Sequence, residues 1–217
     1  MAVTIGFLHT SPVHVATFDS LVANSPGAVS ATHIVDEELL ALARSIGSAH
    51  PFVVEGTVAA LVRLAGAGVD VIVCTCSTIG AVAETVPGIG VPVLRVDRPM
   101  AAAAVASGNR IAVVAALEST LGPTAELLHD ESVHVGRAPR ITLMPCLAAW
   151  DRWENGDIDG YHRTIAEHVD ALDEPFDVVV LAQASMLGAL AFIDERPGRV
   201  VLSSPSSAVQ AALAIVG

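Results

Sequence analysis

The sequence is poor in several residue classes, and each scarcity excludes a kind of protein. Aromatic residues make up only 4% of the 217 residues, and there are 3 cysteines. Cys74, Cys76 and Cys146 are too few and too unevenly spaced for a disulfide framework, which indicates a reducing compartment. Only 11 basic residues face 23 acidic ones, for a net charge of −12. Phosphate neutralisation needs clustered basic side chains, so we expect no nucleic-acid partner.

Long apolar runs are missing as well. No window approaches the ~18 uninterrupted apolar residues of a membrane span, and no basic segment precedes the first apolar run. The composition is nevertheless 53% hydrophobic, with 17 glycines and 12 prolines, which excludes disorder. We therefore expect a soluble, cytoplasmic, globular chain that contacts no membrane, built as one α/β domain or as two smaller ones.

Apolar β-branched runs alternate with helical segments along the whole chain. This alternation is typical of a parallel α/β architecture. Residues 150–160 are polar and predict turns, and residues 161–172 predict an amphipathic helix. The strands are expected at residues 3–8, 30–35, 69–73, 91–96, 110–115, 141–145, 176–181 and 200–202.

Two stretches about a hundred residues apart have the same layout. A buried strand at 69–73 leads through Cys76 into a helix, and a buried strand at 176–181 leads through Gln183 into another. We infer an internal duplication with one site between the halves. The expected domains are 1–97 with 204–217, and 98–203. A dinucleotide fingerprint is absent, because Gly88-x-Gly90 precedes a strand instead of following one.

Cys76 is the first candidate for chemistry. Ser77 and Thr78 are predicted helix caps, with the helix running over 79–84. A cysteine at such a junction feels the positive end of the helix dipole, which favours thiolate and thus acid/base or nucleophilic work. The alternative is plain packing, since free cysteines are often buried. No second paired ligand motif accompanies the Cys-x-Cys pair, so we expect no metal.

The order and spacing of several motifs resemble the cofactor-independent aspartate/glutamate/hydantoin racemase superfamily. The resemblance spans nearly the whole chain. It rests on Ile5-Gly6-Phe7-Leu8-His9-Thr10, Cys76-Ser77-Thr78, Val96-Asp97 with Pro99-Met100, Ala115 before Ser119-Thr120, Gly156-Asp157 with His162, and Leu181-Ala182-Gln183-Ala184-Ser185-Met186.

The resemblance implies two pseudosymmetric Rossmann-like or flavodoxin-like α/β domains with mainly parallel sheets and an active-site cleft between them. It also implies a small carboxylate-bearing substrate, no cofactor and a homodimer or higher homo-oligomer. In two-cysteine members one thiolate removes the α-proton and the other thiol reprotonates the opposite face, because a single base would return the proton to its original side.

The sequence departs from this pattern at one place. Cys76 matches the first cysteine, but Gln183 stands where the second is expected, and glutamine has no titratable proton. We expect an amino-acid or hydantoin racemase-like isomerase with Cys76 as acid/base. The alternatives are an arylmalonate decarboxylase-like lyase with one cysteine, a maleate isomerase-like enzyme in which the thiolate adds to a double bond, and a non-catalytic carboxylate-binding protein.

Other residues have competing interpretations. Cys74 is expected to pack in the core, and His162 to be structural or on the surface. Cys146 and His9 are candidates for the missing acid, although burial is the expected role of Cys146. Charged residues after His33 favour helix-dipole stabilisation over a metal or acid/base cluster. The predicted substrate-binding residues are His9, Thr10, Ser77, Thr78, Ser119, Thr120, Ala184 and Ser185.

Overall fold

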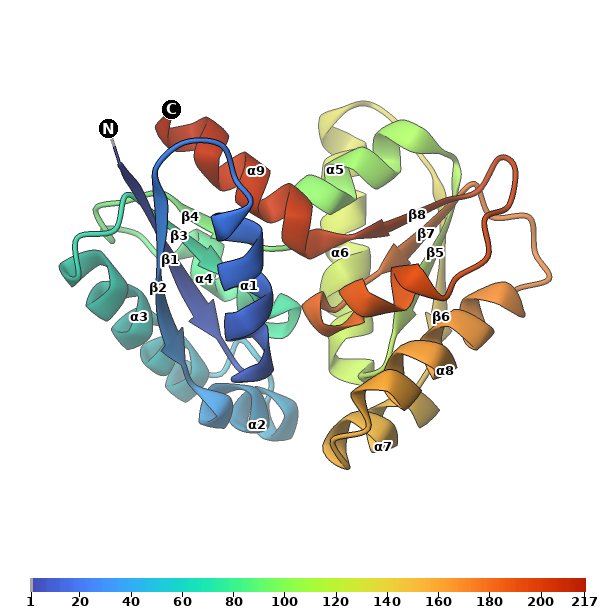
Figure 1. Ribbon diagram of the computed structural model, residues 1–217, viewed down its shortest axis with the longest axis horizontal. Coiled ribbons are helices and arrows are strands. Elements are labelled where there is room, and N and C mark those ends of the chain that lie inside the picture. Colours follow the sequence, from blue (N-terminus) through green and yellow to red (C-terminus); the bar gives the residue numbers. More distant parts are fainter. Residues whose placement is uncertain (1) are drawn as a thin grey trace. The chain divides into compact units, whose positions relative to one another are not determined.

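A computed structural model describes residues 2–217 and divides the chain into two compact units (Figure 1). The first unit extends to Asp97 and also includes Pro205–Gly217, and the second is Arg98–Ser204. The helix that follows the fourth strand of each unit belongs to the other unit. Both units are α/β, as the alternation of strands and helices predicts.

The first unit contains a four-stranded parallel sheet in the order β2-β1-β3-β4. Its strands are β1 (Val3–His9), β2 (Val29–Val35), β3 (Val71–Cys74) and β4 (Val93–Arg95). Its helices are α1 (Val13–Ala23), α2 (Glu37–Ile46), α3 (Pro51–Gly66), α4 (Ser77–Thr85) and, from Pro205 on, α9 (Ser204–Val216).

The second unit repeats this topology with the sheet order β6-β5-β7-β8, also parallel throughout. The repeated order confirms the predicted pseudosymmetric pair of parallel α/β domains. Its strands are β5 (Arg110–Ala115), β6 (Arg140–Pro145), β7 (Val178–Leu181) and β8 (Val200–Ser203). Its helices are α5 (Arg98–Ser107), α6 (Glu118–His134), α7 (Ala148–Glu154), α8 (Ile158–Asp170) and the 3-10 helix η1 (Ala184–Ala191).

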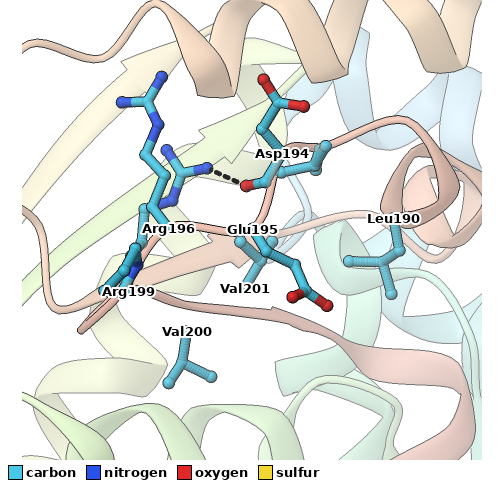
Figure 2. Close-up of a pocket in the computed structure, with 9 residues that line it drawn as sticks. Leu190, Asp194, Glu195, Arg196, Arg199, Val200 and Val201 are labelled. Atoms are coloured by element: carbon cyan, nitrogen blue, oxygen red, sulfur yellow. Dashed lines mark hydrogen bonds between the residues drawn. The ribbon is translucent and has the colours of Figure 1, made fainter.

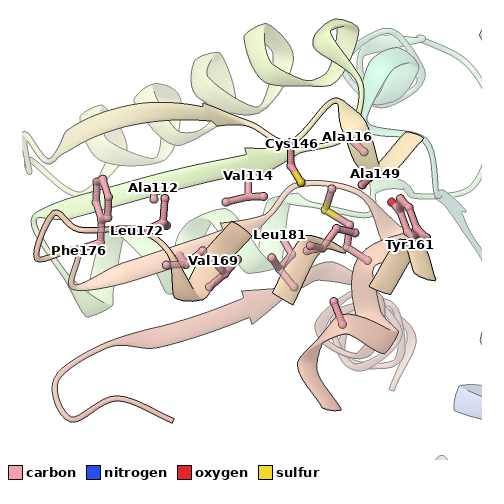
Figure 3. Close-up of a cluster of buried hydrophobic side chains, with 14 residues drawn as sticks. Ala112, Val114, Ala116, Cys146, Ala149, Tyr161, Val169, Leu172, Phe176 and Leu181 are labelled. Carbon is pink, nitrogen blue, oxygen red and sulfur yellow. The ribbon is translucent and has the colours of Figure 1, made fainter. Parts of the chain in front are cut away.

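The two inner strands of each sheet carry the core. All residues of β3 and β7 are buried, as expected for β-branched runs covered on both faces. In the second unit one core cluster packs inner-strand side chains against Tyr161, Ile165 and Val169 of α8 (Figure 3). Because aromatic residues are scarce, these cores interlock mainly through alanine, valine, leucine and isoleucine side chains.

The prediction of turns over residues 150–160 is wrong at 150–154, where α7 forms, and at 158–160, where α8 begins. The Trp150 indole stacks on Trp153 with ring centroids 6.1 Å apart, and its Nε1 donates to Glu154 Oε1 at 2.6 Å. These contacts between near neighbours on one helix offset the polarity of the segment. Among the described residues, no helix is long and apolar enough to cross a membrane.

A buried ion pair joins the end of β4 to the start of the next connection. Arg95 Nε and Nη2 donate to the two carboxylate oxygens of Asp97 at 2.7 and 3.0 Å, and both side chains are at most 4% exposed. Helix α4 packs directly on this pair, since a Cβ at Gly80 would lie 3.0 Å from Arg95 Cβ. Glycine at this position therefore permits the close approach of α4 to the sheet edge.

We expect Asp97→Asn to destabilise the protein by about 3–5 kcal/mol, because it leaves the Arg95 charge buried without its carboxylate. The exposed pair Asp159–Arg163, at 3.2 Å, is the matched control, and Asp159→Asn should cost no more than about 1 kcal/mol. Urea unfolding followed by circular dichroism measures both. Equal losses in the two variants would contradict a special role for the buried pair.

Candidate active site

In parallel sheets the carboxyl ends of the strands lie at one edge, where ligands of α/β proteins usually bind. In the first unit β1 ends at His9 and β3 ends beside it, with Leu8 opposite Cys74 in the register. The Thr75 amide extends this pairing by donating to the Leu8 carbonyl at 2.9 Å. His9, Thr10, Thr75 and Cys76 therefore follow adjacent strands at the same edge.

Cys76 occupies the N-cap of α4. Its backbone is extended (φ −104°, ψ 111°), the side chain makes no capping hydrogen bond, and the residue is 8% exposed. Ser77 and Thr78 are buried in the first helical turn, so the prediction that they cap the helix is corrected by one residue. The thiol thus stands at the end of the helix where backbone N–H groups lack partners within the helix, the place where a negative charge is favoured.

Cys74 lies in the strand core, as expected. It is fully buried, and its thiol donates to the Cys76 carbonyl at 3.7 Å. Burial, with the neighbouring Cys76 adding to it, raises the pKa of Cys74 far above its usual value. Cys74 therefore remains a neutral thiol, and its hydrogen bond to the Cys76 carbonyl supports the connection between β3 and α4.

His9 is fully buried, and both ring nitrogens are engaged. Nδ1 lies 2.8 Å from Thr75 Oγ1, and Nε2 lies 2.8 Å from His33 Nδ1. Burial, followed by the neighbouring His14 and His33, lowers the pKa of His9 to about 3. A histidine with this pKa and these partners is neutral near pH 7, which disfavours the idea that it replaces the missing acid.

Cys146 belongs to the hydrophobic core of the second unit, where Figure 3 shows its sulfur directed into the cluster. It is 5% exposed and its thiol donates to the Thr164 carbonyl at 3.9 Å. Burial raises its pKa. A core thiol whose ionisation is disfavoured fits the expected packing role better than that of a second acid/base.

Gln183 occupies the position after β7 that Cys76 occupies after β3. Its Oε1 accepts hydrogen bonds from the amides of Ala116 and Leu117 at 2.6 and 3.2 Å. Since backbone N–H groups can only donate, the side-chain oxygen must face them and the NH2 group points the other way. The carboxyl ends of β5 and β7 are thus tied together, and two N–H donors remain at the tip of the glutamine.

Ser119 and Thr120 lie in the first turn of α6, which begins at Glu118 behind the N-cap Leu117. Both residues are therefore inside the helix. Thr120 is 2% exposed. The Ser119 hydroxyl is buried and has no hydrogen-bond partner within residues 2–217. Buried hydroxyls are normally bonded, so this one is a candidate contact for a ligand.

Ala184 and Ser185 open η1 directly after Gln183. The Ser185 hydroxyl lies 2.7 Å from the Tyr161 hydroxyl, and the Ser185 carbonyl lies 3.0 Å from His162 Nε2. Burial raises the pKa of Tyr161, so its phenol stays neutral. His162 has the expected structural role, because it holds the turn that follows Gln183 from the side of α8.

A pocket of about 590 Å³ in the second unit lies elsewhere (Figure 2). It is lined by residues between Leu190 and Val201, at the amino end of β8, and contains none of the predicted site residues. Its Arg199 side chain already donates to the Asp170 carboxylate and the Asp194 carbonyl, both at 2.9 Å. Within residues 2–217, no group of three or more His, Cys, Asp or Glu side chains is placed to hold a metal ion.

Comparison with known families decides the relationship. A profile described as Asp/Glu/Hydantoin racemase matches residues 25–212. The chain belongs to this family. A search of curated proteins finds no match.

Solved structures of family members and a decarboxylase share the fold. The aspartate racemase of Picrophilus torridus is 14% identical with a TM-score of 0.74, covering 100% of this chain and 95% of its own. The allantoin racemase of Pseudomonas fluorescens is 16% identical with a TM-score of 0.61, covering 100% and 91%. An arylmalonate decarboxylase is 15% identical with a TM-score of 0.60, covering 99% and 92%. At these identities the likeness shows the fold only.

Sequence reasoning did not identify the contacts that organise both strand edges. The hydrogen bonds of Thr75 and His33 to His9, and of Gln183 to Ala116, join residues between 24 and 67 positions apart. The sequence shows a histidine or a glutamine at the end of an apolar strand. Without the strand register, it does not show which residue forms the hydrogen bond with that side chain.

We expect Gln183→Leu to lower the free energy of unfolding by about 1–3 kcal/mol, because the amides of Ala116 and Leu117 lose their acceptor. Gln183→Glu keeps an oxygen in place and should retain most of the stability near pH 7. Urea unfolding of the two variants measures the difference. Equal stability of the leucine variant and the wild type would show that the glutamine oxygen does not hold the two amides.

The buried histidines predict a loss of stability in mild acid. The folded pKa of His9 is about 3 and that of His14 about 4, against 6.5 for the free side chain. The unfolded chain therefore binds more protons below pH 6.5. Stability is full above that pH and falls by up to about 1.4 kcal/mol per pH unit for each histidine. His14→Gln should halve the slope between pH 6.5 and 5 and leave it unchanged above pH 7.5, as measured by urea unfolding at each pH.

Proposed function

We propose that this chain is an enzyme that transfers a proton at a carbon α to a carboxylate, without a cofactor, with Cys76 as the acid/base. The first form of the proposal is an isomerase resembling amino-acid or hydantoin racemases. Membership of the racemase family supports it, and so does the N-cap position of Cys76 at the carboxyl end of β3. A thiol at the start of a helix is suited to both removing and returning a proton.

The observation that carries the proposal is the difference between two equivalent positions. Cys76 follows the last residue of β3 by two positions, and Gln183 follows the last residue of β7 by two positions. One junction offers a thiol and the other offers amide donors. Carbanion chemistry uses both kinds of group: one that moves the proton, and others that stabilise the oxygen atoms as negative charge develops.

Groups in the second unit are suited to binding the carboxylate. The Gln183 NH2 group carries two donors, because its oxygen is bound by the Ala116 and Leu117 amides. The buried Ser119 hydroxyl has no hydrogen-bond partner among the described residues, and it lies at the start of the helix that follows the neighbouring strand β5. We propose that these donors bind a substrate carboxylate or the enediolate that forms from it.

The chemistry proposed here needs no pyridoxal phosphate. That cofactor works through a Schiff base with a lysine, and the 11 basic residues of this sequence are all arginine. Acidification of the α-carbon must then come from charge stabilisation around the carboxylate. The proposed Gln183 and Ser119 donors would provide it.

A second candidate function is decarboxylation with one-sided protonation by Cys76. The hydrogen bonds of Gln183 favour it, because a side chain that holds two backbone amides and has no titratable proton cannot return a proton to the opposite face. Loss of CO₂ leaves a carbanion that needs only one acid. The similarity of the fold to an arylmalonate decarboxylase is compatible with this alternative.

Cys76→Ala should lower turnover by about 10²- to 10⁴-fold, the usual contribution of a positioned acid or base. The assay is a panel of amino acids, hydantoins and substituted malonates in heavy water, with optical rotation and deuterium content of the product measured together. Exchange with inversion identifies an isomerase, and loss of CO₂ with one deuterium gained identifies a lyase. A maleate-type substrate is added to the panel. Formation of a fumarate-type product from it would identify nucleophilic use of the thiol instead.

Cys146→Ala is the matched control, since it removes a core thiol of the second unit and should leave the activity nearly unchanged. Undiminished turnover in the Cys76 variant would refute the proposal. Thermal stabilisation of the wild type by a dicarboxylate, with no product and no deuterium in the recovered ligand, would show a carboxylate-binding protein in its place.

A further inference from the structure

Four side chains of the first unit form a continuous hydrogen-bonded relay. The Asp19 carboxylate on α1 lies 3.0 Å from His33 Nε2, and His33 Nδ1 lies 2.8 Å from His9 Nε2. His9 Nδ1 in turn lies 2.8 Å from Thr75 Oγ1. The relay therefore runs from a partly exposed carboxylate to the residue immediately before Cys76.

The strand register brings these residues together. Phe7 pairs with His33 across β1 and β2, and side chains two positions apart on a strand share a face, which places His9 beside them. The two imidazole rings stack at 5.1 Å, and Phe18 of α1 lies 5.6 Å from the His9 ring. The two imidazole rings are thus enclosed between sheet and helix, whereas Asp19 reaches the surface. The exposed fraction is 58% for the Asp19 side chain and 15% for His33.

Donor and acceptor rules assign the protons. Asp19 as a carboxylate can only accept, so His33 carries its proton on Nε2. When His33 is neutral, its Nδ1 accepts a proton from His9 Nε2, and His9 Nδ1 then accepts from the Thr75 hydroxyl. Asp19 therefore determines, through two rings, the direction in which the Thr75 hydroxyl points.

The Thr75 hydroxyl has a second acceptor within reach, because the Leu8 carbonyl lies 3.1 Å from Thr75 Oγ1. Its single proton can bond only one of the two acceptors at a time, so the state of His9 Nδ1 selects between them. The His33 ring faces Asp19 on α1 and His9 on β1, and His14 of α1 lies 6.1 Å from the His9 ring.

We propose that Asp19 and His33 are positioning residues that act through His9 on Thr75 and thereby hold the strand end that carries Cys76. The proposal rests on the proposed role of Cys76 in catalysis. It assigns a function to two residues that stand well apart from the thiol in the sequence. Small displacements of a reacting group are costly in catalysis, so a fixed strand end matters for turnover.

The first test reads the tautomers of the two rings by long-range ¹H–¹⁵N correlation on histidine-labelled protein at pH 8. The wild type should show the proton on Nε2 of both His9 and His33. Asp19→Ala should give a mixture of tautomers at both rings, and alanine preserves the helix. Asp159→Ala, an exposed helical carboxylate paired with Arg163, is the control and should leave both rings unchanged.

The second test measures the consequence at the strand end. Loss of the relay should speed exchange of the Thr75 amide, bonded to the Leu8 carbonyl at 2.9 Å, by about tenfold. With the substrate that the panel identifies, kcat should fall about tenfold while KM changes little. His33→Phe should reproduce both the faster Thr75 exchange and the lower kcat, since phenylalanine keeps the stacking on Phe7 but makes no hydrogen bond.

A proton on His9 Nδ1 in the wild type at pH 8, or unchanged tautomers in Asp19→Ala, overturns the relay. Shifted tautomers with unchanged Thr75 exchange and kcat overturn the positioning role. The measurement of the tautomers and the measurement of amide exchange are both independent of Cys76. Cys76→Ala is measured beside Asp19→Ala. If Cys76→Ala kept full activity while Asp19→Ala altered the tautomers and sped up exchange of the Thr75 amide, the proposed function would be refuted. The positioning of the strand end by the relay would still be supported.

Discussion

The whole arrangement depends on the need of backbone N–H groups at the carboxyl edge of a parallel sheet to find acceptors. Each strand ends there and each following helix begins there, so donors without helical partners accumulate at one edge. In the second unit the Gln183 side chain satisfies two of them, at Ala116 and Leu117. In the first unit the equivalent residue is Cys76, whose side chain makes no capping hydrogen bond. The first turn of the following helix thus has a side-chain acceptor close by in one unit and an uncapped thiol in the other.

Buried polar contacts hold the edge of the first unit from several sides. The Arg95–Asp97 pair lies under α4, the Cys74 thiol donates to the Cys76 carbonyl, and His9 contacts Thr75. Each buried donor or acceptor is costly without its partner, so these contacts leave the chain few alternative conformations around the thiol. The conformation around Cys76 therefore depends on side chains other than the Cys76 thiol itself.

Much of the fold was predictable from the sequence, because buried parallel strands are continuous β-branched runs. Such runs can be recognised without knowing which distant residues they contact. The run before Cys76 and the run before Gln183 identified β3 and β7, one inner strand of each sheet, and their repetition. Helix α7 was missed because stacked tryptophans, and not an apolar stripe, stabilise it. The cap of α4 lies one residue before its predicted position, since Cys76 takes the extended N-cap conformation without a capping side chain. The relay depends on strand register, which a single sequence does not specify.

The environment of Gln183 determines what a thiol at this position would change. A cysteine at this position has only a weak acceptor, and it would leave the Ala116 and Leu117 amides without the oxygen that now lies 2.6 and 3.2 Å from them. Glutamine at this position joins β5 to β7 and directs two N–H donors away from the two amides. Replacing it with a thiol would introduce a titratable group and at the same time release the loop before α6. The two junctions are therefore coupled to the fold differently: removal of the Cys76 thiol deletes no capping bond, whereas a change at Gln183 alters the backbone that follows β5.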